Sequence, residues 1–328
     1  MLIRTIIILL ILLPTKALAD NYASDFLYIG SGVRATALGG AFVALADDSS
    51  ACYWNPAGLS QLKGREIILT HASKFSGLAS FDCIGYSQSL PIGSIGLNWM
   101  RFSVGEIPIF PEPEGNSGQR KNSLKYRPSA EPEGYISDVE NALFLSYGKN
   151  FRINITPGLL YTNTWANLSV GGSLKLISQS LAGQRASGNG LDTGIIFRMD
   201  AGSLFDYENV GQISIGLNIQ DINTSIQWNT PQQQKYNLPT NYRMGMAYSL
   251  NRVKHDLNIS LARDSAYKTT VRFGIEYNYN KLLALRLGLM ESDFSAGFGI
   301  KKGIFSVDYS YQKQDLAGSH QVGISINF

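Results

Sequence analysis

The chain contains 328 residues, with 28 Lys and Arg against 25 Asp and Glu, and its formal net charge is +3 at pH 7. Charged residues make up 16% of the chain and are scattered along it, which argues against the concentrated positive charge of nucleic-acid-binding proteins. Every apolar run after Ala19 is interrupted by a charge or by polar alternation, so no transmembrane helix is predicted there.

The first segment has the features of an export signal. Arg4 supplies a positive charge, Thr5 to Leu13 is apolar, and Ala17-Leu18-Ala19 is a small-residue cleavage site. The alternative is an uncleaved anchor helix, but the apolar run is short for spanning a bilayer. We therefore predict that residues 1–19 are a removed signal peptide and that the protein is exported.

The next distinctive segment, ALGGAFVALADDSSACYWNPAGL (Ala37–Leu59), is small and apolar and shows no alternation. Gly39-Gly40 permits close backbone approach, Asp47-Asp48-Ser49-Ser50 is typical of a turn with helix caps, and Asn55-Pro56 is typical of a helix start. The pattern predicts two short helical pieces that are too apolar to lie free in water. Because they end just before the first predicted strand, we predict that residues 20–64 form a plug, or hatch.

From Arg65 onward, apolar and polar residues alternate with the period of two that is typical of β-strands. A soluble sandwich turns the apolar face inward, whereas an outer-membrane barrel turns it to lipid. The polar face is rich in Gly, Ser and Asn, which favours a barrel lumen, and it includes the charged residues Lys175, Arg272, Glu276 and Arg286.

We therefore predict an all-β protein, in which residues 65–328 form a closed antiparallel transmembrane β-barrel with the hatch inside its lumen. The segments predict about fourteen strands, an even number as in bacterial single-chain barrels. They lie near 65–73, 78–90, 93–105, 139–149, 166–178, 190–199, 211–220, 240–250, 255–264, 268–280, 282–291, 294–302, 303–312 and 320–328.

The connections between these strands carry independent information. If both chain ends are periplasmic, every second connection must be short, and the turns near Pro91, Asn251, Lys281 and Lys302 satisfy this rule. The long connections 106–138 and 221–240 then lie on the outer side. The connection 150–165 breaks the rule and is interpreted as an insertion. Aromatic residues near strand ends suit an interfacial girdle, although strand propensity alone also enriches them: Tyr279, Tyr309, Tyr311 and Phe328.

The sequence predicts no catalytic centre, metal site or cofactor. His71, His255 and His320 occur singly, without metal-ligand spacing or a Gly-x-Ser-x-Gly motif. The stretch Gly30–Ala35 matches a dinucleotide-binding fingerprint only formally, because no βαβ unit surrounds it.

Two cysteines remain in the predicted mature chain, Cys52 in the hatch and Cys83 on the second strand. Alternation turns Cys83 inward, towards the hatch. One interpretation is a disulfide that pins the hatch to the wall, which an exported protein permits. The other is a pair of free, buried thiols.

The run GSGVRATALGGAFVALADDSSACYWNPAGLSQLKGREI (Gly30–Ile67) closely resembles the N-terminus of PorV/PorQ-type outer-membrane proteins of the FadL-like superfamily of long-chain fatty-acid transporters. Phe26–Gly30, Ser103–Pro108 and the C-terminal segment 295–328 also resemble this family. The resemblance implies a fourteen-stranded barrel whose hatch carries Asn55, Pro56 and Ala57. The chain departs from the family pattern at Cys52 and at the 150–165 insertion.

The resemblance implies two functions. In FadL-type relatives, the hatch and a gap in the barrel wall let apolar molecules pass, whereas PorV and PorQ are associated with type IX protein secretion and surface attachment. We expect a non-enzymatic protein of the bacterial outer membrane, in contact with membrane lipid, that passes fatty-acid-like solutes by hatch movement. The alternative is a component that binds secreted proteins. The residues expected to form the hatch or gate are Gly39, Gly40, Asp47, Asp48, Trp54, Asn55, Pro56, Ala57 and Gly58.

Overall fold

The computed structural model describes residues 24–112, 114–122, 125, 131–155, 164–205, 210–265, 269–314 and 317–328. The predicted signal segment 1–19 and the first hatch residues, 20–23, lie outside the described residues.

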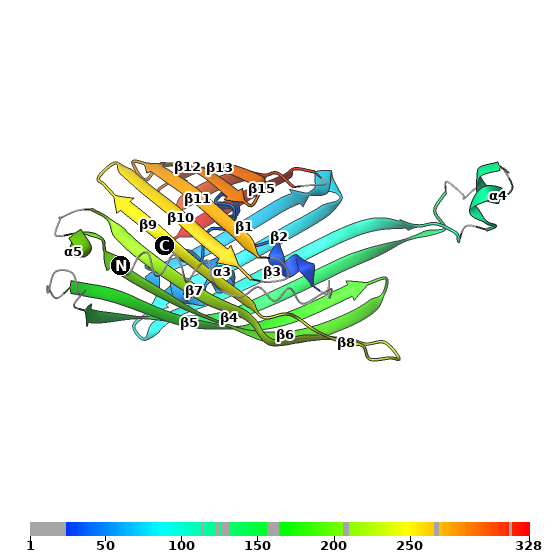
Figure 1. Ribbon diagram of the computed structural model, residues 1–328, viewed down its shortest axis with the longest axis horizontal. Helices are drawn as coiled ribbons and strands as arrows, with labels where there is room; N and C mark the ends of the chain where they lie inside the picture. The colour runs from blue at the N-terminus through cyan, green and yellow to red at the C-terminus, as the bar shows by residue number, and fades with distance from the viewer. Residues whose placement is uncertain are drawn as a thin grey trace.

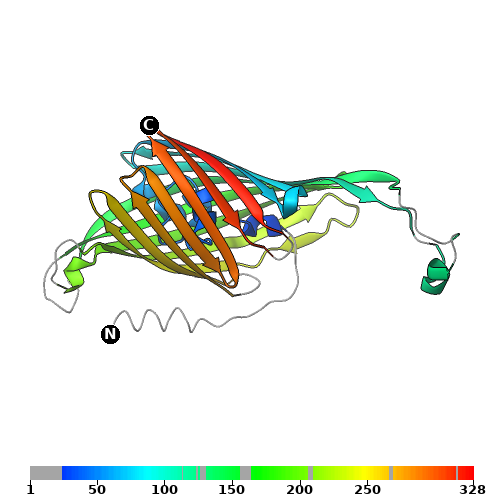
Figure 2. The same ribbon diagram turned by 90° about the horizontal axis from the view of Figure 1, so that it is seen from above.

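Fourteen strands form a closed antiparallel barrel, in which each strand pairs with its neighbours along the chain (Figures 1 and 2). The barrel closes where β1 pairs with β15, and a short extra strand, β8 (Lys235–Asn237), extends β7 beyond the wall. The barrel strands are β1 (Arg65–Lys74), β2 (Ala79–Leu90), β3 (Gly93–Ile109), β4 (Gly134–Ile155), β5 (Thr164–Leu181), β6 (Gln184–Asp200), β7 (Gln212–Trp228), β9 (Asn241–Asn251), β10 (His255–Asp264), β11 (Thr270–Tyr279), β12 (Leu283–Met290), β13 (Asp293–Lys302), β14 (Phe305–Gln312) and β15 (Ser319–Asn327).

Each predicted strand overlaps one barrel strand, but the strands β3 to β7 are longer than predicted. The predicted long connections were wrong at their ends, because 106–109 and 134–138 continue β3 and β4, and 221–228 continues β7. Irregular pairing between Val104 and Ile107, with Glu106 at a φ of 51°, interrupts the alternation on which the prediction depended. The predicted 150–165 insertion was also too long, because β4 runs to Ile155 and β5 begins at Thr164. The remainder, 156–163, lies outside the described residues.

The apolar face of the sheet points away from the lumen, as a transmembrane barrel requires. Leu285 and Val322 are 61% and 48% exposed, whereas Ser214 and Asn218, on the other face, are almost fully buried. Among the described residues, no helix is long and apolar enough to cross a membrane. A soluble sandwich is therefore excluded, because its apolar face would be the buried one.

The two ends of the barrel differ. At the terminus end, β1 begins beside the last residues of β15, and the Arg65 N–H donates to the Phe328 carbonyl oxygen. At the opposite end, which we call the arm end, β3 and β4 continue as a two-stranded arm far beyond the wall towards α4 (Ser117–Asn122) (Figure 1). The other short helices outside the lumen are η3 (Phe75–Gly77) and α5 (Gly202–Phe205).

The hatch, described here as residues 24–64, lies inside the barrel (Figures 1 and 2). It contains η1 (Asp25–Tyr28), α2 (Val33–Ala37), α3 (Ala51–Trp54) and η2 (Pro56–Gln61). Asn55 caps η2 as predicted, because its side-chain oxygen accepts from the Ala57 N–H at 3.2 Å and Pro56 occupies the first position. Nearly every residue from Phe26 to Leu59 is buried or half-buried, which makes the hatch the core of the protein.

Candidate functional site

The hatch winds around the lumen against a belt of wall glycines. Along the hatch, Val33 contacts Gly323 on β15. Val43 contacts Gly245 on β9 and Gly216 on β7, and Leu59 contacts Gly96 on β3. A Cβ atom at any of these glycines would meet hatch atoms at less than van der Waals distance, so only glycine lets the hatch lie this close to the wall. The belt consists of Gly323, Gly297, Gly288, Gly274, Gly245, Gly216, Gly194, Gly171, Gly148 and Gly96.

Asn55 joins the hatch to the wall between β6 and β7. Its Nδ2 donates to the carbonyl oxygen of Val43 at 2.9 Å within the hatch, and to the carbonyl oxygens of Ile195 and Leu217 in the wall at 3.3 and 3.2 Å. The side chain is fully buried, so these bonds are made without competition from water. Its neighbours Pro56 and Ala57 pack on Gly171, and Gly58 packs on the Ala46 carbonyl.

Arg34, on α2, is the charged centre of the hatch. Its guanidinium donates twice to Glu276 on β11, each bond at 2.8 Å, and it also pairs with Asp47. Asp48 lies 3.7 Å from the same group. Burial alone would lower the pKa of Arg34, but Asp47 and Glu276 raise it well above its ordinary value. The bidentate pair therefore holds a permanent charge and ties the hatch to the wall.

The wall side of this contact is a chain of alternating charges. Arg286 on β12 donates from Nε to Glu276 at 2.7 Å and from Nη1 to Asp308 on β14 at 2.5 Å. Asn258 on β10 donates to the second Glu276 oxygen at 2.9 Å. Glu276 therefore has all its charge compensated, although it is only 1% exposed.

Two further arginines reach the hatch from the wall. Arg272 donates to the Gly39 carbonyl oxygen at 3.1 Å and pairs with Asp264 at 2.9 Å. Arg243 donates to the Tyr53 hydroxyl at 2.8 Å, and its guanidinium lies over the ring of Trp54 at 5.0 Å. Gly40 packs between Arg272 and Trp54, and Gly39 packs on the backbone of Leu289, so both predicted hatch glycines are in close contact at this point.

The ion pairs of Lys175 are with the wall and not with the described residues of the hatch. Its Nζ lies 2.6 Å from Asp221 and 3.2 Å from Asp192, and all three residues are almost fully buried. This triad stands where the pairing of β6 with β7 is irregular, with register shifts on both sides of Leu191 and with Asp221 and Asn223 at φ values of 60° and 50°. The triad therefore fills a bulged part of the wall.

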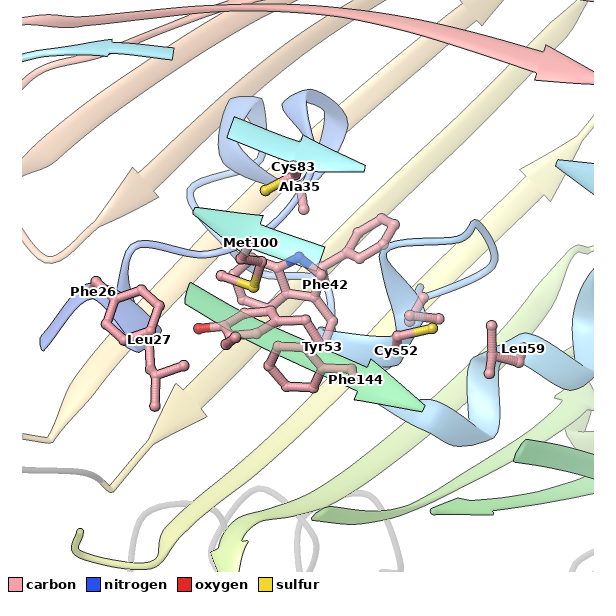
Figure 3. Packing of buried hydrophobic residues seen from close by; sticks show 14 of the residues in the cluster. Phe26, Leu27, Ala35, Phe42, Cys52, Tyr53, Leu59, Cys83, Met100 and Phe144 are labelled. Atoms are coloured by element: carbon pink, nitrogen blue, oxygen red, sulfur yellow. The ribbon is translucent and has the colours of Figure 1, made fainter. Parts of the chain in front are cut away.

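One sector of the lumen wall on the arm side of the glycine belt, on β2 to β5 and β7, is apolar. Phe26 and Leu27 of η1 belong to the same buried cluster as the apolar side chains of this wall sector. Next to η1, Gln179 on β5 donates a hydrogen bond to the Ser24 hydroxyl at 2.7 Å. Figure 3 shows Phe26 and Leu27 at one side of the cluster, with Met100, Tyr53 and Phe144 in its centre. The wall side chains of this apolar lining are Phe81, Met100, Phe102, Phe144, Ile177, Ile226 and Trp228.

On the other side of Arg34 lies a polar cavity of about 310 Å³ between the hatch and strands β11 to β15 and β1. Asp47, Asp48 and Arg34 of the hatch border it, together with charged wall residues. The wall contributes Glu66, Glu276, Arg286 and Asp308, with Lys281 and Lys301 at the terminus end. The two sides of the hatch therefore differ in chemistry, because the arm side has an apolar sector, whereas the cavity on the terminus side is bordered mainly by charged and polar residues.

Both cysteines are free and buried. Figure 3 shows Cys52 beside Leu59 and Cys83 beside Ala35, at different points of the cluster. Burial raises the pKa of the Cys52 thiol to about 12. The structure thus has the two buried thiols and not the disulfide.

The structure brings together most of the predicted hatch and lumen residues, but sequence reasoning missed several partners. Arg34 was overlooked, although it is the single charge between Gly30 and Ala46. The glycine belt was also missed; its signal is a glycine at an inward position on most strands. The acidic partners of Lys175 require the tertiary pairing of β5, β6 and β7.

Comparisons with known proteins extend this description. A family model described as "Uncharacterised protein family (UPF0164)" matches residues 15–104, which include the hatch and most of β1 to β3. No curated protein matches the chain. Among solved structures, the CymD monoaromatic hydrocarbon channel is similar with a TM-score of 0.54 and 11% identity, over 92% of this chain and 98% of that one. The TodX deltaS2S3 mutant monoaromatic hydrocarbon channel is similar with a TM-score of 0.52 and 13% identity, over 91% and 99%. The likeness is one of fold.

Proposed function

We propose that the protein is an outer-membrane channel for apolar small molecules, with its terminus end in the periplasm. The observation that carries this proposal is the apolar lining on the arm side of the hatch. A water-filled pore has a polar interior, whereas a lumen lined by residues such as Met100, Phe144 and Ile226 favours an apolar solute. The fold shared with hydrocarbon channels supports the same conclusion.

In this proposal, the solute takes the place of η1. Phe26 and Leu27 are each 2% exposed, so they occupy the volume that an apolar molecule of similar size would fill. Hatch movement, expected from the sequence, is restricted here to η1, because residues 33–59 lie against the glycine belt and are tied to the wall by Arg34 and Asn55.

The polar cavity makes a straight path through the lumen unfavourable for such a solute, because it would pass the charges around Arg34 and Glu276. The irregular pairing of β6 with β7 offers a sideways path towards lipid, next to Asn55, once the Lys175–Asp192–Asp221 triad that fills this part of the wall moves aside. We therefore place the solute's exit at this bulge, in keeping with the wall gap that the family resemblance implies.

Uptake of radiolabelled toluene and oleate by cells that lack their own hydrocarbon channel tests the proposal. Leu27→Ala should raise uptake, because it empties part of the apolar lining. In the double variant Ser24→Cys/Gln179→Cys, a cleavable bifunctional thiol reagent should abolish uptake until it is reduced, since the two side chains lie 2.7 Å apart in the native protein. Each single-cysteine variant, treated with the same reagent, is the control.

Uptake by the wild type that does not exceed the background of cells without the protein would refute the channel. Copurification with secreted surface proteins in the absence of uptake would instead favour the docking role. Uptake that survives crosslinking at positions 24 and 179 would leave a channel but exclude η1 as its movable part.

A further inference from the structure

Three turns at the terminus end combine basic and exposed apolar residues. Each presents an exposed apolar residue, with Val253 at 92%, Ile304 at 46% and Leu282 at 41% exposure. Each apolar residue lies within two positions of a basic residue, and the turns read Arg252-Val253-Lys254, Asn280-Lys281-Leu282 and Lys301-Lys302-Gly303-Ile304. No acidic residue interrupts these three stretches. Lys281, Leu282 and Lys301 also border the mouth of the polar cavity.

The three turns form one continuous surface. The Asn280 N–H donates to the Lys254 carbonyl oxygen at 2.6 Å, and the Lys301 N–H donates to the Leu282 carbonyl oxygen at 2.8 Å. The next turn is fixed in the same way, because the Asn327 N–H donates to the Ile304 carbonyl oxygen at 2.8 Å. We call residues 252–254, 280–282 and 301–304 the basic rim.

The five basic side chains of the rim are exposed. Among the residues that the structure describes, none of the five forms an ion pair or a side-chain hydrogen bond: Arg252, Lys254, Lys281, Lys301 and Lys302. Their positive charge is therefore available to an anionic partner at the rim.

Strand length indicates which partner this is. β12 and β14 have 8 residues each, compared with 22 in β4. At about 3.3 Å per residue and a tilt of roughly 35–45°, eight residues span only about 19–22 Å of membrane, less than the apolar band of about 25 Å. Leu282 directly precedes β12 and Ile304 directly precedes β14, so these turn residues extend the apolar surface to the required height.

Aromatic side chains next to the rim support the same position. Tyr279 and Phe305 are 44% and 53% exposed, and the Tyr277 hydroxyl is paired with the His255 ring at 2.7 Å. Tyrosine rings next to lysines are typical of the level at which acyl chains meet headgroups. A surface for an acidic periplasmic protein would not need apolar turn residues at the ends of short strands.

We propose that the basic rim is a binding site for anionic phospholipid, in which Val253, Leu282 and Ile304 enter the acyl boundary and the five basic residues hold headgroup phosphates. This site anchors the short-strand side of the barrel in its membrane leaflet. It depends on the transmembrane barrel but not on the solute that the channel carries.

Single-cysteine probes test the depth of the rim. Val253→Cys, Leu282→Cys and Ile304→Cys are labelled with an environment-sensitive fluorophore in vesicles of phosphatidylcholine and phosphatidylglycerol; the native thiols are buried and stay unlabelled. Lipids with a nitroxide near the carbonyl level should quench all three probes strongly. The control is Lys235→Cys, on β8 at the arm end, which should stay in water. Rim probes that behave like the control would overturn the proposal and favour an acidic protein as the partner.

The charges are tested separately with the triple variant Lys281→Gln/Lys301→Gln/Lys302→Gln. Native mass spectrometry of protein released from the same vesicles measures retained phosphatidylglycerol. Retention should fall about fivefold for each lysine removed, and the exposed arm-end triple Lys121→Gln/Lys235→Gln/Lys313→Gln should not change it. Equal retention by the rim variant and the wild type would refute phosphate binding. If the rim variant fails to fold, the depth of the three cysteine probes decides the question.

Discussion

Glu276→Gln is expected to loosen α2 from the wall without emptying the lumen. Glu276 accepts two bonds from Arg34, one from Arg286 and one from Asn258. Removing one partner of a buried ion pair costs about 3–5 kcal/mol. Arg34 keeps Asp47, and its side chain is 22% exposed, so we reduce the expected loss to about 2–3 kcal/mol.

Cys83 reports this loosening, because it is 1% exposed and lies beside Ala35 of α2 (Figure 3). A loss of about 2–3 kcal/mol raises the population of the open form by about 30- to 140-fold. The rate of Cys83 alkylation by a small maleimide, followed by peptide mass spectrometry, should rise by that factor. The rate at Cys52 is the internal reference for movement of the remaining hatch.

Glu106→Gln, on the exposed arm, is the matched control and should leave both rates unchanged. Labelling of Cys83 in Glu276→Gln within about twofold of the wild type, in a protein that still migrates as a folded barrel, would show that this ion pair does not hold α2. Equal acceleration at both cysteines would show that the hatch moves as one unit, against the restriction of movement to η1.

Three further outcomes are expected. Gly171→Ala should lower stability by about 1–3 kcal/mol, because its Cβ would meet the hatch backbone, whereas Gly105→Ala should be neutral; heat-dependent gel mobility compares them. In the native protein at pH 8, neither Cys52 nor Cys83 should be alkylated quickly, because both thiols are buried and Cys52, with a pKa of about 12, is protonated at pH 8. Both cysteines should react after denaturation, and a disulfide between them would contradict this prediction. Lys175→Met should destabilise the barrel by about 3–5 kcal/mol in urea, because two buried carboxylates lose their cation; an unchanged midpoint would contradict a charged triad.

The sequence alone determined the barrel and its outward face. Every barrel strand was predicted, because a residue exposed to lipid on one face and to a filled lumen on the other must alternate with a period of two. The cap at Asn55 and the helical character of the hatch were also predictable, since both depend on residues that are neighbours in the chain. Even the inward position of Cys83 followed from counting along one strand.

Only the tertiary structure decided what the inward residues touch. The pairs Arg34–Glu276 and Lys175–Asp221 join segments far apart in the chain, and alternation places a charge in the lumen without choosing its partner. The length of β4 and the bulges of β7 were likewise hidden, because irregular pairing breaks the period that predicts a strand. Local patterns therefore fix which face a side chain occupies, whereas the closing of the barrel around the hatch fixes its contacts and the chemistry of the lumen.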